Sequence, residues 1–400
     1  MKLNNIPMLS ICYITRINFQ ANKAHVYNTA RTCEALSMIP EVVPTLVSVN
    51  GSMRSAKART AFFRKHGVKK EFPIVSLSSL GSRIGGGSRV LNVIGVLLDN
   101  LSLAVYVLRN RRGIDVVYFR DGRVFLPVCI AKLLGKPVFF EIHAALHSVY
   151  SQLLMKILAR ISDGLVNISY GLDSFYKKYN TNSVVSFCSA SDPEMFREVK
   201  SKSELRAELH LPANKIILGY TGNLSVTGNN DSYGIEDIIR ALSLLSENII
   251  FIGVGKKGNE TEALEKLTDE LGVAERVLLL PWVSKEKIAE YALAFDILVI
   301  PSSGAQIGNS PTKMFEYLSA GRPIVAANTE AIAEVLVSGK NSILVDYKDP
   351  NSWAGAISGI LNDSSLSQKI IEQAKKDAKI YTWEKRGRDI YSFIVATIKK

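Results

Sequence analysis

Short apolar runs that alternate with longer amphipathic segments are the feature that most restricts how this chain can fold. In the first half the runs fall at Ile114–Phe119, Val138–Ile142 and Gly164–Ser169, with a helix expected at Phe125–Leu134. In the second half the same alternation predicts six strands, at Ile216–Tyr220, Ile249–Ile252, Val277–Leu280, Asp296–Ile300, Ile324–Ala327 and Ile343–Val345. Continuous apolar strands separated by helices are typical of parallel βαβ units covered on both faces. We therefore expect an α/β protein with two doubly wound sheets, whose ligands bind beyond the carboxyl ends of the strands.

The length of the chain allows two domains. A chain of 400 residues fits two domains of about 100–200 residues each. Ser, Asp and Pro gather near Val185–Phe196, so we place one domain at residues 1–189 and the next at residues 190–382. Two helices are expected after the last strand, at Leu366–Ile380 and Trp383–Ile398.

Positive charge is concentrated in the first half. Residues 1–200 hold 26 lysines and arginines against 12 acidic residues, and residues 201–400 hold 23 against 25. One basic segment combines Phe62 and Phe63 with Arg54, Lys57, Arg59, Arg64, Lys65, Lys69 and Lys70. Basic residues beside interfacial aromatics favour an anionic membrane surface as partner. A solvated basic face is the alternative, and nucleic acid is not expected because no nucleic-acid-binding motif accompanies the charge.

The apolar run Val90–Leu108 precedes a second basic group, Arg109, Arg111 and Arg112. The run contains Asn92, Asp99 and Asn100, which are costly at the centre of a bilayer. It therefore predicts a core or interfacial helix and not a transmembrane span.

The cysteines and the N-terminal residues indicate the cytosol. Cys12, Cys33, Cys129 and Cys188 are widely spaced and show neither a disulfide framework nor metal-ligand spacing. Lys2–Ile14 is broken by Pro7 and lacks a cleavage site, so we expect a buried first strand there and not a signal peptide. Together with the charge distribution, this predicts a cytoplasmic protein that is peripheral on the inner face of the cell membrane.

Residues 301–323 predict a helix whose start binds an anion. Ser310 suits the N-cap and Pro311 the first helical position. Lys313 then falls at the third position, where the interaction of a cation with the helix dipole is unfavourable by about 0.3–1 kcal/mol. A bound phosphate would resolve the conflict, because backbone N–H groups, the dipole and Lys313 would converge on it; a solvent-facing lysine is the alternative. Glu316 lies one turn later on the same face and can accept hydrogen bonds from ribose hydroxyls.

Polar residues also follow two strands of the first domain. His143 comes directly after Val138–Ile142, at the sheet edge where ligands bind. It is a candidate for contact with a substrate, and a structural histidine is the alternative. Arg120 and Asp121 leave the strand Ile114–Phe119 at the same edge and either contact an acceptor or pair with each other.

The stretch Ser310–Val325 resembles the donor-binding motif of retaining glycosyltransferases of family 4 (glycosyl transferases group 1), which have the GT-B fold of two facing Rossmann-like domains. Further resemblances follow in the family's order, at Phe19–Val26, Pro137–His143, Gly219–Leu224, Glu334–Pro350 and Trp383. The resemblance implies an interdomain cleft, a C-terminal domain that binds a nucleotide-sugar donor, and a terminal helix, residues 383–400, that crosses back to the first domain.

The resemblance also implies a set of site residues. It implies catalytic roles for His143 and Lys313. It also implies that Asn22, Lys23 and Arg120 contact the acceptor or line the cleft. The residues implied to bind the donor are Gly222, Asn223, Gly308, Asn309, Ser310, Pro311, Thr312, Lys313 and Glu316. No metal or other cofactor is implied, because the lysine and the helix N-terminus neutralise the leaving group. Gly308 replaces a frequent glutamate, and Asn223 and Tyr233 replace an arginine and a lysine that clamp the diphosphate.

The resemblance implies a retaining hexosyltransferase that moves a sugar from a nucleotide-diphosphate donor. The resemblance and the basic first domain together imply a lipid-linked glycan in surface polysaccharide biosynthesis as the acceptor. One alternative is a sugar-nucleotide 2-epimerase of the same fold. It would need acid and base carboxylates facing the cleft, and we cannot place such residues in the sequence. A non-catalytic nucleotide-sugar or membrane-binding module is the other alternative. The pattern Gly253–Gly258 matches G-x-G-x-x-G, but it lies late in the second domain, so we do not expect a dinucleotide site.

Overall fold

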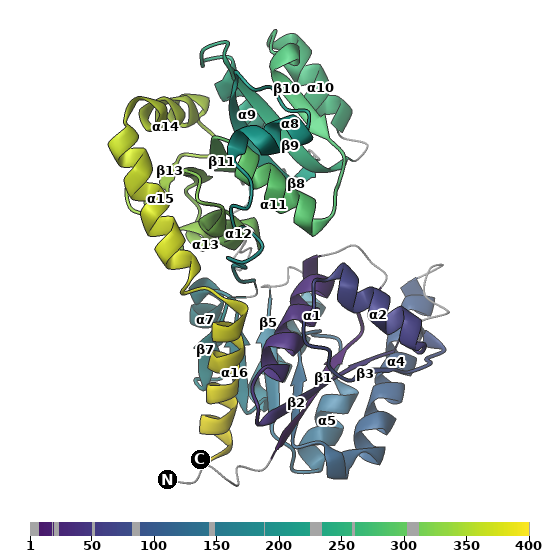
Figure 1. The fold of residues 1–400 in the computed structure, drawn as a ribbon. Coiled ribbons are helices and arrows are strands. Elements are labelled where there is room, and N and C mark those ends of the chain that lie inside the picture. The colour runs from purple at the N-terminus through teal and green to yellow at the C-terminus, as the bar shows by residue number, and fades with distance from the viewer. Residues whose placement is uncertain are drawn as a thin grey trace. The chain divides into compact units, whose positions relative to one another are not determined.

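The chain forms two α/β units in the computed structural model (Figure 1). The structure describes residues 8–17, 19, 24–49, 53–81, 89–143, 149–187, 189–224, 234–257, 261–301 and 312–399. Unit 1 comprises Met1–Cys188 with Trp383–Lys400, and unit 2 comprises Ser189–Thr382. The expectation of an α/β protein with two parallel sheets is confirmed.

Unit 1 is built on a parallel sheet with the strand order β3-β2-β1-β4-β5-β6-β7. Its strands are β1 (Leu9–Thr15), β2 (Val42–Ser48), β3 (Ile74–Ser76), β4 (Val116–Phe119), β5 (Val138–Ile142), β6 (Gly164–Asn167) and β7 (Ser183–Val185). Its helices are α1 (Ala24–Ser37), α2 (Ala56–Lys65), α4 (Arg89–Arg109), α5 (Leu126–Leu133), α6 (Val149–Ile161), α7 (Tyr170–Tyr176) and α16 (Trp383–Ile398). Strand β5 has the predicted bounds, and β4 and β6 are each two residues shorter than predicted.

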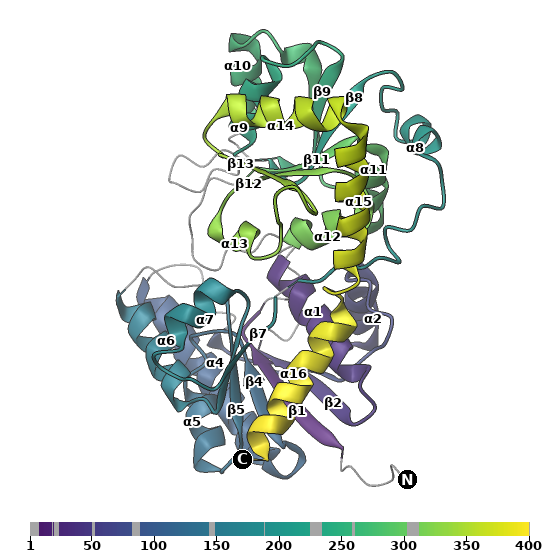
Figure 2. The ribbon, with the colours of Figure 1, turned by 90° about the vertical axis from the view of Figure 1, so that its left-hand side faces the viewer.

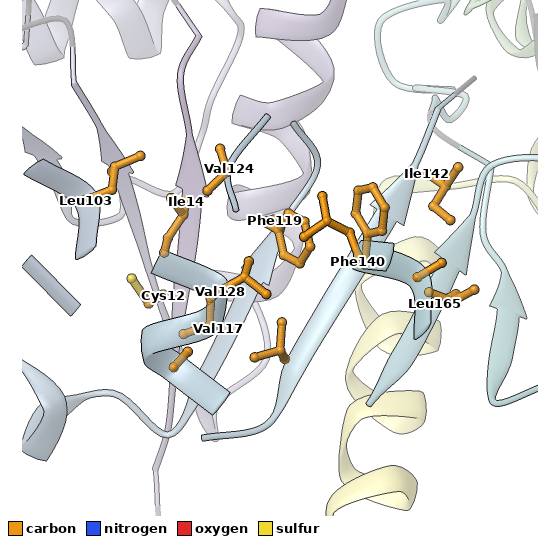
Figure 3. Packing of buried hydrophobic residues seen from close by; sticks show 14 of the residues in the cluster. Cys12, Ile14, Leu103, Val117, Phe119, Val124, Val128, Phe140, Ile142 and Leu165 are labelled. Carbon is orange, nitrogen blue, oxygen red and sulfur yellow. The ribbon is translucent and has the colours of Figure 1, made fainter. Parts of the chain in front are cut away.

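The two faces of this sheet bury separate apolar clusters, because successive side chains of a strand point to opposite faces. Val117 and Phe119 of β4 pack with Phe140 of β5 on the face that α4, α5 and α6 cover, and Phe119 and Phe140 stack with ring centroids 4.5 Å apart (Figure 3). Val116 and Tyr118 point to the other cluster, which α1, α2 and α16 cover.

The expectation that Phe62 and Phe63 accompany the basic segment at a membrane surface is wrong. Their exposed fractions are 2% and 4%, and both belong to the core cluster beneath α2. Phe63 packs edge-on against Phe72 with ring centroids 5.1 Å apart. Helix α2 is amphipathic, so Lys57, Arg64 and Lys65 are exposed on the opposite face, and Arg59 is partly buried.

Helix α16 crosses one face of the unit 1 sheet next to α1 (Figure 2). Close approach requires Gly387, because a side chain there would place its Cβ 2.7 Å from the carbonyl oxygen of Ala35. Trp383 at the start of α16 is buried against Tyr27, with ring centroids 5.9 Å apart. These contacts explain why the last residues of the chain fold with unit 1.

Unit 2 holds a second parallel sheet with the order β10-β9-β8-β11-β12-β13. Its strands are β8 (Ile216–Leu224), β9 (Ile249–Lys257), β10 (Val277–Leu280), β11 (Ile297–Ile300), β12 (Ile324–Ala327) and β13 (Ile343–Val345). Its helices are α8 (Lys202–Glu208), α9 (Ile235–Leu242), α10 (Thr261–Glu270), α11 (Lys285–Ala294), α12 (Thr312–Ala320), α13 (Glu330–Ala333), α14 (Pro350–Asn362) and α15 (Ser364–Ala378).

Strands β8 and β9 are longer than predicted, and glycine explains the difference. Gly222 pairs with Gly255 in the parallel ladder, and a side chain at Gly255 would place its Cβ 1.4 Å from the carbonyl oxygen of Gly222. The resemblance to the family implies a turn at Gly219–Leu224, but these residues form the end of β8, and Gly253 and Gly255 lie inside β9.

Candidate functional site

The carboxyl end of β8 is tied to α12 by a tyrosine. The hydroxyl of Tyr317 accepts a hydrogen bond from the Thr221 backbone N–H at 2.8 Å and lies 3.1 Å from Thr221 Oγ1. Tyr317 is fully buried, so this contact fixes the helix against the strand end. The face of α12 that begins with Lys313, four residues earlier, is thereby directed at the carboxyl end of the sheet.

Lys313 packs over an aromatic ring. Its Nζ lies 3.8 Å from the centroid of Tyr220, and a side chain at Gly222 would place its Cβ 2.7 Å from Nζ. Gly222 has φ +152°, which also favours glycine. Among the residues described, no carboxylate forms an ion pair with Lys313, and burial lowers the pKa of its amine to about 7. Lys313 is therefore a partly buried amine held against a ring, and not a lysine that faces solvent without a contact.

Glu316 lies one turn further along α12 and pairs with Lys285 of α11. The side chains are 12% and 26% exposed, respectively. Sequence reasoning missed Lys285, although a signal exists: it is the first residue of α11, a second helix that begins with a cation where the dipole favours an anion. Two lysines from two helix starts thus lie around one turn of α12.

The structure describes only part of the predicted donor site. Thr312 begins α12, and Asn223 lies near the end of β8, where its carbonyl oxygen accepts a hydrogen bond from Tyr220 at 3.1 Å. Asn22, Lys23, Tyr233, Gly308, Asn309, Ser310 and Pro311 lie outside the described residues.

In unit 1, a buried carboxylate organises the candidate residues at the end of β5. Glu141 is 1% exposed and its Oε2 accepts hydrogen bonds from the Tyr118 hydroxyl and from Arg386 Nη2, the latter at 2.9 Å. Arg386 also donates to the carbonyl oxygens of Ser186 and Phe187. Burial alone would raise the pKa of Glu141, but the charge of Arg386 and the contact with His143 hold it well below its usual range.

The same network fixes the tautomer of His143. Arg120 Nη2 lies 3.2 Å from Nδ1, and because a guanidinium only donates, Nδ1 accepts and Nε2 carries the proton. Nε2 then donates to Glu141 Oε1 at 2.5 Å. Burial, followed by the charge of Arg120, lowers the pKa of His143 to about 4, so the ring is neutral at physiological pH. Both ring nitrogens are occupied within unit 1, which suits a positioned ring better than a proton-transfer group.

Glu141 and Arg386 were not singled out as site residues. A carboxylate inside the otherwise apolar run Val138–Ile142 was the available signal, because a buried charge requires a partner.

Arg120 does not pair with Asp121, so that alternative is wrong. Arg120 Nη1 donates to the carbonyl oxygen of His25 and to Thr29 Oγ1 on α1, both at 3.1 Å. Asp121 instead pairs with Arg123 at 3.1 Å. Arg120 therefore joins α1 to His143.

A metal site was not expected, and the described part of the chain holds no group of three or more His, Cys, Asp or Glu residues that could bind a metal ion.

Comparison with known proteins identifies the fold. Residues 201–377 match the family Glycosyl transferases group 1. The D-inositol 3-phosphate glycosyltransferase of Xylanimonas cellulosilytica is 25% identical over 206 residues, which are 50% of this chain and 48% of that protein. The chain thus spans about half the length of the curated relatives it matches.

Two solved structures cover nearly the whole chain. HepE of Anabaena in complex with UDP has a TM-score of 0.76 at 16% identity, over 97% of this chain and 100% of that chain. The sucrose-phosphate synthase of Thermosynechococcus elongatus has a TM-score of 0.75 at 16% identity, over 98% and 99%. These likenesses confirm the GT-B fold.

Proposed function

We propose that this protein is a glycosyltransferase that moves a sugar from a nucleotide-diphosphate donor to an acceptor. The observation that carries the proposal is Lys313, a partly buried amine with a lowered pKa to which the described residues provide no carboxylate partner. It stands at the start of α12, inside the segment that matches Glycosyl transferases group 1. A helix start and a partly buried cation together favour an anionic ligand.

The diphosphate of the donor is the anion we assign to this position. Negative charge grows on the leaving diphosphate as its bond to the sugar breaks, and Lys313 would stabilise that charge. Support comes from HepE, whose structures hold UDP and UDP-glucose. Glu316 would hold the ribose one turn further on, where it would exchange its contact with Lys285 for one with the hydroxyls.

We further propose transfer of a hexose with retention of configuration, as the resemblance to family 4 implies. The acceptor oxygen attacks the anomeric carbon on the face of the leaving diphosphate while the bond from that carbon to the phosphate oxygen breaks. The hydroxyl proton passes to the departing phosphate oxygen, so the step requires neither a protein base nor a metal. A neutral His143, held by Arg120 and Glu141, would contact the sugar without exchanging a proton.

A lipid-linked glycan of a surface polysaccharide is the acceptor we propose, with the protein in the cytoplasm and peripheral on the inner face of the membrane. The excess of positive charge in residues 1–200 supports this location.

Product analysis with a panel of labelled nucleotide sugars tests the proposal. We expect a transferred sugar; an epimerised donor would identify a sugar-nucleotide 2-epimerase, and the absence of any product would leave a non-catalytic module. The donor can first be selected by thermal stabilisation, because a ligand at a hundredfold excess over its dissociation constant adds about 2.7 kcal/mol to the native state.

The variant Glu316→Gln should weaken binding of the free nucleoside diphosphate as well as of the sugar donor, because the ribose is common to both. Isothermal titration calorimetry measures both affinities. Lys285→Met is the matched control, since it breaks the same ion pair but keeps the carboxylate, and it should leave nucleotide affinity unchanged or higher. If Glu316→Gln instead binds nucleotide normally but unfolds more easily, Glu316 has only a structural role.

A further inference from the structure

Helix α4 is apolar on the side that faces away from the core as well as on the side that faces it. On the inner side, Leu103 and Val107 are fully buried, and Asp99 pairs with Arg16 at 2.8 Å. Six outer side chains are 41% to 67% exposed: Val90, Val93, Ile94, Leu97, Leu101 and Leu108. Counted from Val90 they fall 3, 4, 7, 11 and 18 positions along the chain, which places them on one side of the helix. A helix that is apolar all round is expected in a core or in lipid, yet none of the described residues covers this outer side.

The apolar surface extends onto the neighbouring helix. Asn100 of α4 donates to the Arg123 carbonyl oxygen at 2.9 Å and accepts from the Leu126 backbone N–H at 3.2 Å. Phe125 and Leu126, at the start of α5, are each 37% exposed. We call these two residues and the six exposed residues of α4 the α4 surface.

Positive charge borders this surface at the end of α4. Arg109, Arg111 and Arg112 are all exposed, and Asp99, which is buried, is the only acidic residue between positions 89 and 112. Arg109 and Arg112 also line a cavity of about 310 Å³ together with Tyr106 and Asn110. A cavity with two guanidinium groups offers room and charge for a phosphate.

We propose that the α4 surface docks in the plane of an anionic lipid bilayer. The apolar side chains enter the interface, and the three arginines meet lipid phosphates. The 21 residues of α4 are long and apolar enough to cross a membrane, but crossing would remove Leu103 and Val107 from the core and expose Asp99. The helix therefore lies along the membrane.

A second copy of the chain fits this surface less well. Two α4 surfaces packed together would bring their arginines to an interface to which residues 89–112 contribute no exposed carboxylate. This inference does not depend on sugar transfer. It assigns the apolar part of membrane contact to α4, because Phe62 and Phe63 are buried.

Sedimentation of the full-length protein with vesicles tests the proposal. Wild-type protein should sediment with vesicles of equal parts phosphatidylglycerol and phosphatidylcholine, but not with phosphatidylcholine alone, and the binding should weaken as salt rises. The double variant Leu97→Ser and Leu101→Ser should lower partitioning at least about tenfold. Replacing Arg109, Arg111 and Arg112 by glutamine should lower partitioning onto the vesicles about a hundredfold, because each arginine is expected to contribute about fivefold.

A matched control removes two exposed apolar residues of unit 2, through Leu244→Ser and Val337→Ser, which are 54% and 42% exposed. It should bind vesicles like wild type. Normal circular dichroism and, where transfer is detected, normal transfer to a soluble acceptor would show that the leucine variant is folded.

Three outcomes would overturn the proposal. The first is undiminished vesicle binding by the leucine variant. The second is a concentration-dependent dimer that the same variant abolishes without vesicles. The third is release caused only by neutralising Arg59, Arg64, Lys65 and Lys69. None of these bears on the transferase assignment, which product analysis tests separately.

Discussion

Replacing Lys313 by methionine should lower the turnover number for sugar transfer by about 10²–10³-fold, as the loss of one contact to developing charge does in other enzymes. Methionine keeps the packing over Tyr220 and removes only the charge. The measurement is steady-state transfer with the donor found in the nucleotide-sugar panel. Lys348→Met is a matched control, because Lys348 lies over the ring of Tyr347 at 5.5 Å but is exposed. Full activity in Lys313→Met would exclude Lys313 from the site.

The stability of the same variant should depend on pH in a defined direction. The pKa of Lys313 is about 7 in the folded protein against an ordinary 10.5, so the unfolded chain binds more protons between these values. The cost of charging Lys313 is thus fully present below pH 7 and disappears as pH rises toward 10.5. Lys313→Met should be more stable than wild type at neutral pH and lose this advantage in alkali, as denaturant titrations at several pH values can measure.

Binding of a nucleoside diphosphate should draw a proton onto Lys313. A phosphate beside the amine favours its charged form and raises its pKa, so near about pH 8 wild-type protein takes up a proton that Lys313→Met does not. Calorimetry in two buffers of different ionisation enthalpy measures this uptake. Equal proton uptake by both proteins would place the phosphates elsewhere.

Replacing Arg386 by methionine should lower the free energy of unfolding of unit 1 by about 3–5 kcal/mol, because it leaves the charge of Glu141 buried without its main partner. The control Arg388→Met alters an exposed arginine of the same helix and should change stability by less than about 0.5 kcal/mol. Chemical denaturation followed by circular dichroism gives both values.

The loss should depend on pH because Glu141 titrates abnormally. Arg386 holds the pKa of Glu141 well below its ordinary 4.5, so the stability from this pair is present above that value and lost as pH falls. The difference in the free energy of unfolding between wild type and Arg386→Met should therefore be largest at neutral pH and become smaller in acid. Adding Glu141→Gln to Arg386→Met should recover part of the loss, since coupled residues are not additive. Strictly additive effects would show that the two side chains are not coupled.

The strands could be predicted because their environment leaves a local trace. Parallel strands covered on both faces are continuously apolar, and Val138–Ile142, Val277–Leu280, Ile324–Ala327 and Ile343–Val345 have the predicted bounds. Strand β8 was cut short at Tyr220 because Gly222 interrupts the apolar run. Its continuation depends on Gly255 in the neighbouring strand, which no local pattern of β8 reveals.

The site residues show the same difference between what a local pattern reveals and what depends on distant segments. The sequence alone singled out Lys313, Glu316 and His143, because a misplaced helix cation and polar residues after buried strands are visible along the chain. Their partners could not be predicted, since Lys285 and Tyr220 come from other segments, and Glu141, which holds His143, itself depends on Arg386. Arg386 lies 245 positions from Glu141, and only the packing of α16 on unit 1 brings them together.

The sequence by itself therefore determined the two parallel sheets, the position of a cation at the start of α12 and the apolar nature of α4, since each is a property of consecutive residues. Only the tertiary structure decided which of these features is covered. Phe62 and Phe63 looked like a membrane-facing pair, but α2 turns them into the core. The outer side of α4 was as apolar as its inner side, and a sheet can bury only the side that faces it. Burial depends on what packs against a residue, and for these segments that is set by parts of the chain far away in sequence.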